Sequence, residues 1–322
     1  MRRRFCVLLC IIIVLCILCP TLVCFAQGES LVPVGEAVSL HLQTDGVYVV
    51  KFDNDDASPA RRAGLKAGDR IVSVNGEELH TVARLQELVR SSGGEELIVC
   101  IRRDGRPMSF TVCPVPVEGG WSMGVYVRDR VSGVGTVTFY DPETGLYGAL
   151  GHGVREGEEL MPMVGGEAGA AEIVEVVRGK AGEPGSLRAA AGEPMAPVEK
   201  NTDCGIFGHA EPGTWTGEAV PAAPRGLAHP GKAEILCCVE GCRTERYAVE
   251  IESLVYDDQG RDLRLRITDP RLLEKTGGIV QGMSGSPILQ DGQLVGAVTH
   301  VLVRDPSRGY GILIDRMLAA AA

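Results

Sequence analysis

The segment from Thr276 to Ile288, TGGIVQGMSGSPI, places a serine inside a glycine-rich turn that runs directly into an apolar strand. Glycines on both sides of Ser284 let the backbone turn sharply. Such a turn aims the N–H groups of Gly282 and Ser284 into one small volume, where they can stabilise a negatively charged oxygen. It also exposes the Ser284 hydroxyl to a base. We therefore predict a nucleophile at Ser284, with Ser286 the weaker candidate, and an oxyanion hole formed by the backbone of Gly282 and Ser284.

A candidate base lies far upstream, where the strand over 147–150 runs into Gly151-His152-Gly153. A histidine between glycines at a strand end is exposed on a rigid support, as a general base requires. A third group should hold its imidazole in one tautomer. Asp203 lies roughly midway between His152 and Ser284, whereas Asp269 lies 15 residues before the serine. Spacing alone favours Asp203 as the acid.

The composition indicates a mainly β protein of more than one domain. The 322 residues include 42 glycines and only 5% aromatic residues, with many short Val- and Thr-rich runs. This combination is typical of short strands and tight turns. The net charge of −10 argues against nucleic acid as a partner.

The N-terminus reads as a membrane segment over residues 1–27. Three arginines precede an unbroken apolar run from Phe5 to Phe25, which as a helix spans roughly 30 Å, about one bilayer core. The positive charges predict that the rest of the chain is exported. Length favours an uncleaved anchor, and cleavage after Ala26 is the alternative.

Residues 28–116 read as an α+β domain. Alternation over 38–42, a turn at Asp45-Gly46 and a run over 47–50 predict two strands. Residues 63–76, AGLKAGDRIVSVNG, resemble the core signature of PDZ domains. The resemblance implies that a peptide adds as a strand beside residues 38–42. It also implies that the peptide carboxylate meets the loop Val34, Gly35, Glu36, Ala37 and Val38, where Glu36 departs from the family's glycine and apolar pattern.

Six cysteines lie beyond the N-terminal run, and an even number permits disulfides in an exported protein. Cys100 and Cys113 fall on neighbouring predicted strands and are the first pair to test. The spacing of Cys237, Cys238 and Cys242 is a poor match to a zinc site. We therefore expect no metal and no cofactor.

Residues 117–322 form the second predicted domain. Its phrases GALGHGV, NTDCGIFG, the long run over 267–301 and GYGILI resemble the SpoIVB peptidase family, the stage IV sporulation protein B of endospore-forming bacteria. The order of anchor, PDZ domain and peptidase also matches. The resemblance implies a chymotrypsin-like double β-barrel serine peptidase with His152 and Ser284 as catalytic residues. It implies that Asp269, and not Asp203, is the catalytic acid, because the family's aspartate matches the one in the phrase Thr268-Asp269-Pro270.

The resemblance further implies a sporulation signalling peptidase. It would act in the space between the mother-cell and forespore membranes, held there by its N-terminal helix. It would cleave itself in its own N-terminal segment and cleave the extracytoplasmic part of a membrane-bound regulator of an intramembrane protease, which activates a late sigma factor. Two alternatives remain open: an HtrA-like envelope quality-control protease, and a catalytically silent PDZ adaptor.

Overall fold

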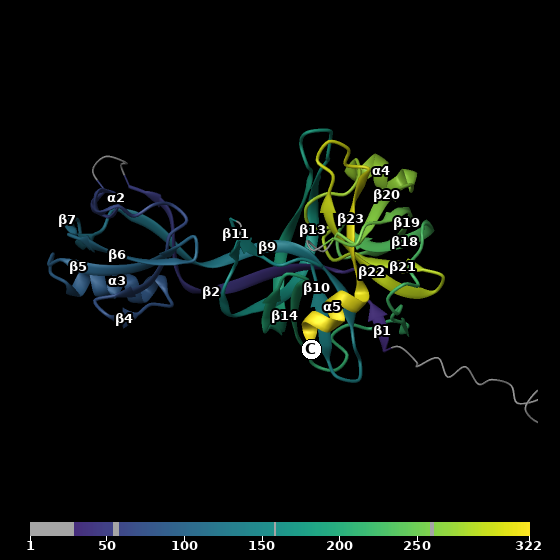
Figure 1. Cartoon of the computed structure of the whole chain (residues 1–322), viewed down its shortest axis with the longest axis horizontal. Helices are drawn as coiled ribbons and strands as arrows, with labels where there is room; N and C mark the ends of the chain where they lie inside the picture. The colour runs from purple at the N-terminus through teal and green to yellow at the C-terminus, as the bar shows by residue number, and fades with distance from the viewer. Residues whose placement is uncertain (1–28, 54–57, 158, 258–260) are drawn as a thin grey trace, which may run out of the picture.

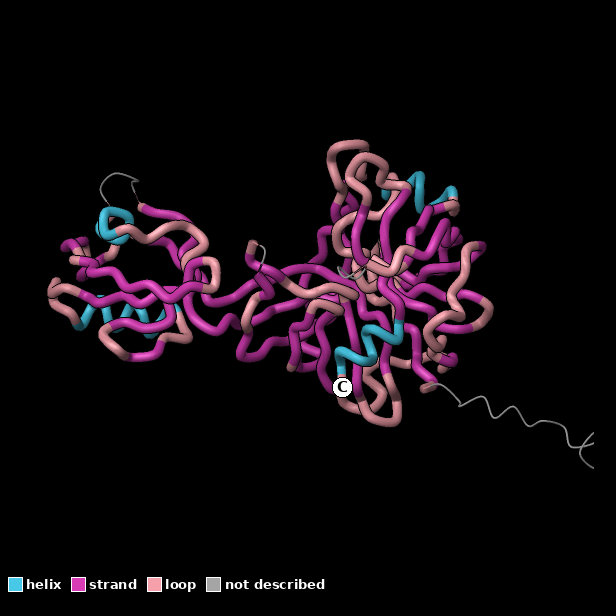
Figure 2. Tube along the Cα trace, viewed as in Figure 1, coloured by secondary structure: helices cyan, strands magenta, loops and turns pink. Residues whose placement is uncertain are grey.

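The computed structural model of the chain describes residues 29–53, 58–157, 159–257 and 261–322. A smaller body and a larger body lie at opposite ends of the long axis (Figure 1). The chain is mostly strand, with a few short helices (Figure 2). No helix in the described ranges is long and apolar enough to span a membrane. The predicted membrane segment over 1–27 lies outside the described residues.

Two long antiparallel strands connect the bodies. β2 (Ala37–Phe52) and β9 (Val125–Tyr140) pair from Phe52 opposite Val125 to Ala37 opposite Thr136. The outer halves belong to the smaller body, where β2 also pairs with β3 (Arg70–Val74). The inner halves belong to the larger body, where β2 also pairs with β13 (Met163–Val177). One ribbon therefore contributes to both sheets.

The smaller body completes its sheet around a core of aliphatic side chains. Its other elements are α2 (Pro59–Ala63), β4 (Glu77–Glu78), α3 (Val82–Ser91), β5 (Leu97–Arg103), β6 (Arg106–Val112), β7 (Val115–Val117) and β8 (Gly120–Ser122). The Ser58 and Thr81 side chains cap the N-termini of α2 and α3, as helix-start signals predict. Left-handed conformations at Asn75-Gly76 and Asp104-Gly105 close its hairpins.

The larger body has two halves. The first contains β1 (Ser30–Pro33), β10 (Leu146–Ala149), the hairpin β11 (Arg155–Glu156) and β12 (Glu159–Leu160), β14 (Ser186–Val198), β15 (Lys200–Thr202), β16 (Gly205–His209) and β17 (Val220–Pro221). The second is a closed barrel of β18 (Gly231–Cys238), β19 (Thr244–Leu254), β20 (Leu263–Ile267), β23 (Arg308–Leu313), β22 (Gln293–Val301) and β21 (Pro287–Gln290). Helices α4 (Pro270–Thr276) and α5 (Ile314–Ala321) complete it.

The mainly β prediction is confirmed, but the double barrel is only half right. Among the described strands one closed barrel forms, and the strands of the first half join a sheet that continues into the smaller body. The physical reason is the ribbon, because β2 and β9 carry their pairing out of the larger body instead of ending at its edge.

The predicted boundary between residues 28–116 and 117–322 needs correction. β1 pairs with β9 at Tyr140 and Phe139, so the first described strand belongs to the larger body. The turn expected at Asp45-Gly46 is an irregularity inside β2, where Gly46 has φ of +108° and the chain continues outward. Alternating polarity identified these strands but not their partners.

The cysteine pair is also corrected. Cys100 lies opposite Ser109 on β6, whereas Cys113 comes after the residue opposite Leu97. The two thiols are therefore separated along the hairpin, and both are free. The six cysteines of the described ranges are all unpaired thiols.

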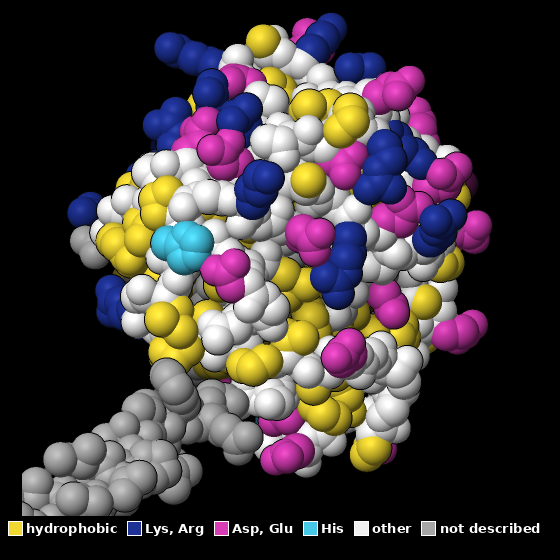
Figure 3. Space-filling model, turned by 90° about the vertical axis from the view of Figure 1, so that its right-hand side faces the viewer, with side chains coloured by type: hydrophobic (Ala, Val, Ile, Leu, Met, Phe, Trp, Pro, Cys, Tyr) yellow, Lys and Arg dark blue, Asp and Glu magenta, His cyan; other side chains and the backbone are white. Residues whose placement is uncertain are grey.

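One face of the larger body, at the end away from the smaller body, mixes charges of both signs (Figure 3). Lys and Arg side chains are interspersed with Asp and Glu over its upper part, and apolar side chains are more frequent below. Such mixing gives this face no field of a single sign.

A buried ion pair stabilises the smaller body. The guanidinium of Arg103 donates to both carboxylate oxygens of Asp69 at 2.7 Å, and the backbone N–H of Lys66 donates to the same group. The Asp69 side chain is fully buried. Removing one partner of such a pair leaves an uncompensated charge in the interior.

We predict that Arg103→Gln lowers the free energy of unfolding of the smaller body by about 3 kcal/mol. Urea denaturation of the full chain followed by Trp121 fluorescence, in a Trp215→Phe background, measures that body. Arg102→Gln is the matched control and should cost less than about 0.5 kcal/mol, because Arg102 is exposed and its side chain, within the described part of the chain, donates only to the Gly105 carbonyl. Equal losses in both variants would contradict the assignment.

Candidate active site

The loop carrying Ser284 is wedged between the two halves of the larger body. The backbone N–H of Thr136 donates to the Ser284 carbonyl at 3.0 Å, and the Thr136 hydroxyl donates to the Gly282 carbonyl at 2.8 Å. A Cβ on Gly285 would lie 2.0 Å from the backbone carbonyl oxygen of Thr136. Gly285 also has φ of +96°, so both its contacts and its backbone conformation require glycine here.

The same turn leaves two backbone donors free. Within the described residues, the N–H groups of Gly282 and Ser284 make no hydrogen bond, while those of Gln281, Met283 and Gly285 all do. Free donors on either side of one residue are what an oxyanion hole needs. The assignment of this role to Gly282 and Ser284 stays a prediction that the geometry permits.

His152 follows β10 through a left-handed turn at Leu150 and Gly151. A Cβ on Gly151 would lie 2.9 Å from the Thr299 methyl group, and one on Gly153 would lie 2.5 Å from the Thr202 carbonyl oxygen. Both flanking glycines are therefore required by packing. His152 Nδ1 lies 3.0 Å from the Gly153 carbonyl oxygen, which can only accept, so Nδ1 carries the proton and Nε2 is left as the base.

His152 and Ser284 line one cavity of about 350 Å³. The structure thus brings together the two residues that lie 132 positions apart in the chain, 284 minus 152. Ser284 Oγ donates to the Thr299 carbonyl at 2.8 Å, so the hydroxyl is held by β22 in this state. Catalytic hydrogen bonds are often incomplete before substrate binds.

A second histidine packs against the base. The rings of His152 and His300 have centroids 5.1 Å apart and are inclined by 36°. Burial lowers the pKa of His152 from its ordinary 6.5. Burial, followed by the charge of His152, lowers the pKa of His300 to about 4. Both rings are therefore neutral near pH 7, as a general base requires. His300 lies on β22, and its local sequence gives no sign of this contact with a residue far away in the chain.

Neither predicted acid touches His152 among the described contacts. Asp269 caps α4, accepts from the backbone and guanidinium of Arg271, and accepts from Ala248 N–H. Arg271 lowers the pKa of Asp269. Asp203 lies in the exposed turn after β15 and pairs with Arg155. Both carboxylates stay predictions as the triad acid.

The turn holding Asp203 nevertheless lies beside the histidine loop. The Asn201 side chain accepts from Val154 N–H and donates to the Val154 and Met161 carbonyls, each at 2.9 Å. Gly153 packs on the adjacent Thr202. Asp269, in contrast, caps the N-terminus of α4 and binds Arg271. These contacts account for its hydrogen bonds without any contact with the imidazole.

The predicted peptide-binding loop is wrong. Val34 and Gly35 donate to the Thr138 and Val137 carbonyls within the larger body, and burial raises the pKa of Glu36. Ala37 and Val38 are buried. Residues 38–42 pair with β9 on one edge and β13 on the other, so no peptide strand can add there.

A groove of the expected kind lies elsewhere, between α3 and the start of β9. It encloses about 390 Å³. The residues that line it are Leu85, Gln86, Val89, Arg90, Val117, Glu118, Gly119, Gly120, Trp121, Ser122, Met123, Val125 and Val127. The alternation of apolar residues and glycine at Met123-Gly124-Val125 was the missed signal, because the first predicted domain ended at residue 116. We call this the PDZ groove.

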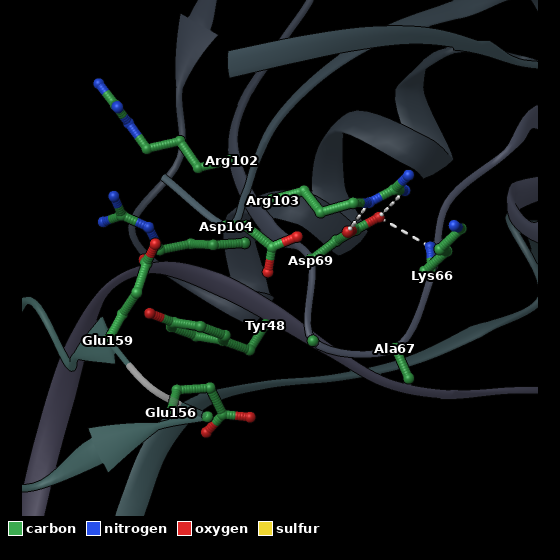
Figure 4. A pocket seen from close by; sticks show the side chains of 12 residues that line it. Tyr48, Lys66, Ala67, Asp69, Arg102, Arg103, Asp104, Glu156 and Glu159 are labelled. Carbon is green, nitrogen blue, oxygen red and sulfur yellow. Dashed lines mark hydrogen bonds and ion pairs between the residues drawn. The ribbon is translucent and has the colours of Figure 1, made fainter. Parts of the chain in front are cut away.

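A charged pocket of about 670 Å³ lies between the smaller body and the β11–β12 hairpin that follows His152 (Figure 4). Tyr48 lies between Glu156 and Glu159 on one side and the Asp69–Arg103 pair on the other. Its lining has four cationic residues, Lys66, Arg70, Arg102 and Arg103, and four acidic ones, Asp69, Asp104, Glu156 and Glu159. Balanced charge favours neither an anion nor a cation. No cluster of metal-ligating side chains occurs in the described ranges.

The lowered pKa of His152 predicts how Ser284 responds to pH. The rate of labelling by a fluorophosphonate should rise as the imidazole loses its proton, with a midpoint below 6.5. Rates measured from about pH 4 to pH 8 test this, with Ser284→Ala as the unlabelled control. A midpoint clearly above 6.5 would contradict the buried, neutral base.

Replacing each acid separates its roles. Asp269→Asn should lower the free energy of unfolding by about 1 kcal/mol or more, because it weakens the cap and the Arg271 ion pair. The residue that acts as triad acid should instead lose several orders of magnitude in turnover with folding intact. Asp203→Asn is the paired variant, and thermal unfolding with labelling rates distinguishes the two effects.

Comparison with curated proteins finds short shared segments. Zinc metalloprotease RasP of Geobacillus kaustophilus is 37% identical over 82 residues, which are 24% of this chain and 20% of that protein. Regulator of sigma-E protease RseP of Escherichia coli is 46% identical over 62 residues, 19% and 14% of the two chains. This chain spans about a fifth of the length of the curated relatives it matches.

Two solved structures resemble parts of the chain. The Rv3671c protease of M. tuberculosis, in an inactive form, has a TM-score of 0.35 and 16% identity, covering 60% of this chain and 85% of that one. The PDZ domain of an SdrC-like protein from Listeria monocytogenes has a TM-score of 0.23 and 21% identity, covering 26% and 87%.

Family profiles cover most of the folded chain. A PDZ domain profile matches residues 55–103, and the part of this range that the structure describes, residues 58–103, lies in the smaller body. The profile of SpoIVB peptidase S55 matches residues 119–318, more than half of the chain, and includes both His152 and Ser284. The resemblance predicted from the sequence is confirmed: the chain belongs to the SpoIVB peptidase S55 family and also contains a match to the PDZ domain.

Proposed function

We propose that the chain is a serine endopeptidase that cleaves protein substrates by acyl transfer to Ser284. The observation that carries this proposal is the shared cavity of Ser284 and His152, with free N–H groups on the serine turn. Without a base the serine hydroxyl is a poor nucleophile. Without fixed donors the negative charge that develops on the substrate oxygen is poorly stabilised.

The reaction follows from these positions. The Ser284 hydroxyl first leaves the Thr299 carbonyl and donates its hydrogen bond to His152 Nε2 instead. His152 Nε2 then takes the hydroxyl proton as Ser284 Oγ attacks the substrate carbonyl carbon. The developing oxyanion accepts from the Gly282 and Ser284 N–H groups. His152 then gives the proton to the leaving amine as the C–N bond breaks. A water molecule, activated by the same imidazole, hydrolyses the acyl-enzyme and regenerates the hydroxyl.

We further propose a signalling role in sporulation, on the basis of the family and the accompanying PDZ domain. The substrate would be the extracytoplasmic part of a membrane-bound regulator of an intramembrane protease. The peptidase would be exported and membrane-anchored through residues 1–27, in the space between the mother-cell and forespore membranes. A panel of unfolded proteins tests this, since broad degradation would favour quality control instead.

Self-cleavage is part of the proposal, and the fold limits where it can occur. Leu31 and Val32 are buried in β1, which pairs with β9 and β17. A peptide bond in this strand cannot reach a catalytic serine without unfolding the strand. We therefore place the self-cleavage site before Ser30.

We predict that the purified wild-type chain shortens itself, with a new N-terminus at or before residue 30, while Ser284→Ala stays intact. N-terminal sequencing of the product measures the position. Ser286→Ala is the matched control and should still cleave, because the Ser286 hydroxyl is buried and donates to the Met283 carbonyl. A chain that neither shortens nor reacts with a fluorophosphonate would support the silent adaptor.

A further inference from the structure

One edge of β9 is open between the PDZ groove and the catalytic cavity. Along its first edge β9 pairs with β2 from Val125 to Thr136. Along its second edge it pairs with β10 only from Val137 to Tyr140. Between Val125 and Gly135 no described strand occupies the second edge. The main-chain groups there can accept an added strand.

Both sites lie along this open edge. The catalytic cavity is lined by residues 131–134 of β9 and by His152 and Gly153, which follow β10, the strand on the second edge. The PDZ groove is lined by Val125 and Val127 together with α3, and by no residue of β2. The open edge therefore faces the PDZ groove at one end and Ser284 at the other.

The two sites are close along the strand. Val131 lies four positions after Val127, about 13 Å in an extended chain. From Val125 to Val134 the distance is about 30 Å, which an extended peptide covers with about ten residues. A single polypeptide can therefore occupy both grooves at once.

We infer that β9 is a substrate track. The C-terminal tail of a protein substrate binds in the PDZ groove, and the bond that is cleaved lies about ten residues upstream, at Ser284. This inference rests on the proposed endopeptidase function and adds the kind of substrate and the position of the cut.

The direction of the peptide follows from the loop that precedes β9. In β-augmentation by a PDZ domain, the peptide carboxylate meets the loop before the paired strand. Here the segment before β9 is residues 118–124, which contains the short strand β8 and ends at the start of β9. The peptide thus runs antiparallel to β9, with its C-terminus at Val125 and upstream residues directed toward Val134.

Contacts in the middle of β9 hold the two ends in register. Asp129 accepts the Val82 N–H at 2.8 Å, which fixes the start of α3 against β9. Arg128 pairs with Glu156 of the hairpin that follows His152. The PDZ helix and the histidine loop are therefore both tied to neighbouring residues of one strand, and the distance between the sites is set by the fold.

The cavity also selects side chains near the cut. Leu40 and Leu42 of β2 and Val131 of β9 share one face of the ribbon and form an apolar wall beside His152. Because the peptide continues from Ser284 toward Val125, this wall contacts residues on the C-terminal side of the cleaved bond. We expect an aliphatic residue there, since the burial of its apolar surface is favourable.

The first test uses the wild-type full chain and synthetic peptides in which a mixed-sequence segment is followed by one fixed apolar tail with a free carboxylate. Products are identified by mass spectrometry, with Ser284→Ala as the control. Cuts should cluster about ten residues from the C-terminus. When Gly-Ser-Gly is inserted before the tail, the cleaved bond should shift three residues along the sequence toward the C-terminus, so that about ten residues still separate it from the C-terminus. Cleavage at the same peptide bond with and without the insertion would contradict the inferred track.

The second test changes the carboxylate and the groove. A peptide with a C-terminal amide should be cleaved at least about tenfold more slowly, and equal rates would overturn the inference. Val127→Glu should slow cleavage of the carboxylate peptide by a similar factor. Ile98→Glu is the matched control, because Ile98 is exposed, lies on β5 and is outside both the groove and the track. Thermal unfolding checks that both variants are folded.

The outcomes also separate this inference from the proposed function. If Ser284 of the wild-type chain reacts with a fluorophosphonate and peptides are cut without regard to their C-terminus, only the track is wrong. If Ser284 does not react and no peptide is cut, the endopeptidase proposal itself fails.

Discussion

The pairing of β2 with β9 is the constraint on which the architecture depends. The two strands are long enough to take part in both bodies, so neither sheet ends at a flexible linker. A two-stranded ribbon is stiffer than a single connecting chain because its main-chain hydrogen bonds fix the register of both strands. The PDZ domain is thereby presented to the peptidase in one orientation, with the charged pocket and the β11–β12 hairpin between them (Figure 4).

The catalytic pair depends on a second constraint, the wedge of the serine loop into the first half of the larger body. Thr136 holds two carbonyls of this loop, and Gly285 allows the close approach. The histidine loop is fixed in turn by Gly151 against β22 and Gly153 against Thr202. The serine loop is therefore positioned by the half that does not carry it, and the histidine loop by contacts with both halves, which preorganises the site.

The Ser284 hydroxyl, donated to Thr299, and the His152 ring, stacked on His300, define a resting arrangement. Two imidazoles in contact disfavour two positive charges, so the low pKa of His300 keeps one of them neutral when the other takes a proton. The base is then free to accept the serine proton. Neither candidate carboxylate contacts His152 among the described residues. Packing favours Asp203, because its turn lies beside the histidine loop, whereas the family resemblance implies Asp269.

The sequence by itself determined the mainly β character, the PDZ signature over 63–76, the serine turn and the glycine-flanked histidine. These are local, because glycine conformation, turn residues and alternation act over a few neighbouring positions. Only the tertiary structure decided the partners: that residues 34–38 lie inside the larger body, that the PDZ groove is built from α3, residues 117–123, Val125 and Val127, and that His300 packs against His152. Strand partners and side-chain contacts between distant segments depend on long-range pairing, which alternating polarity in one strand cannot specify.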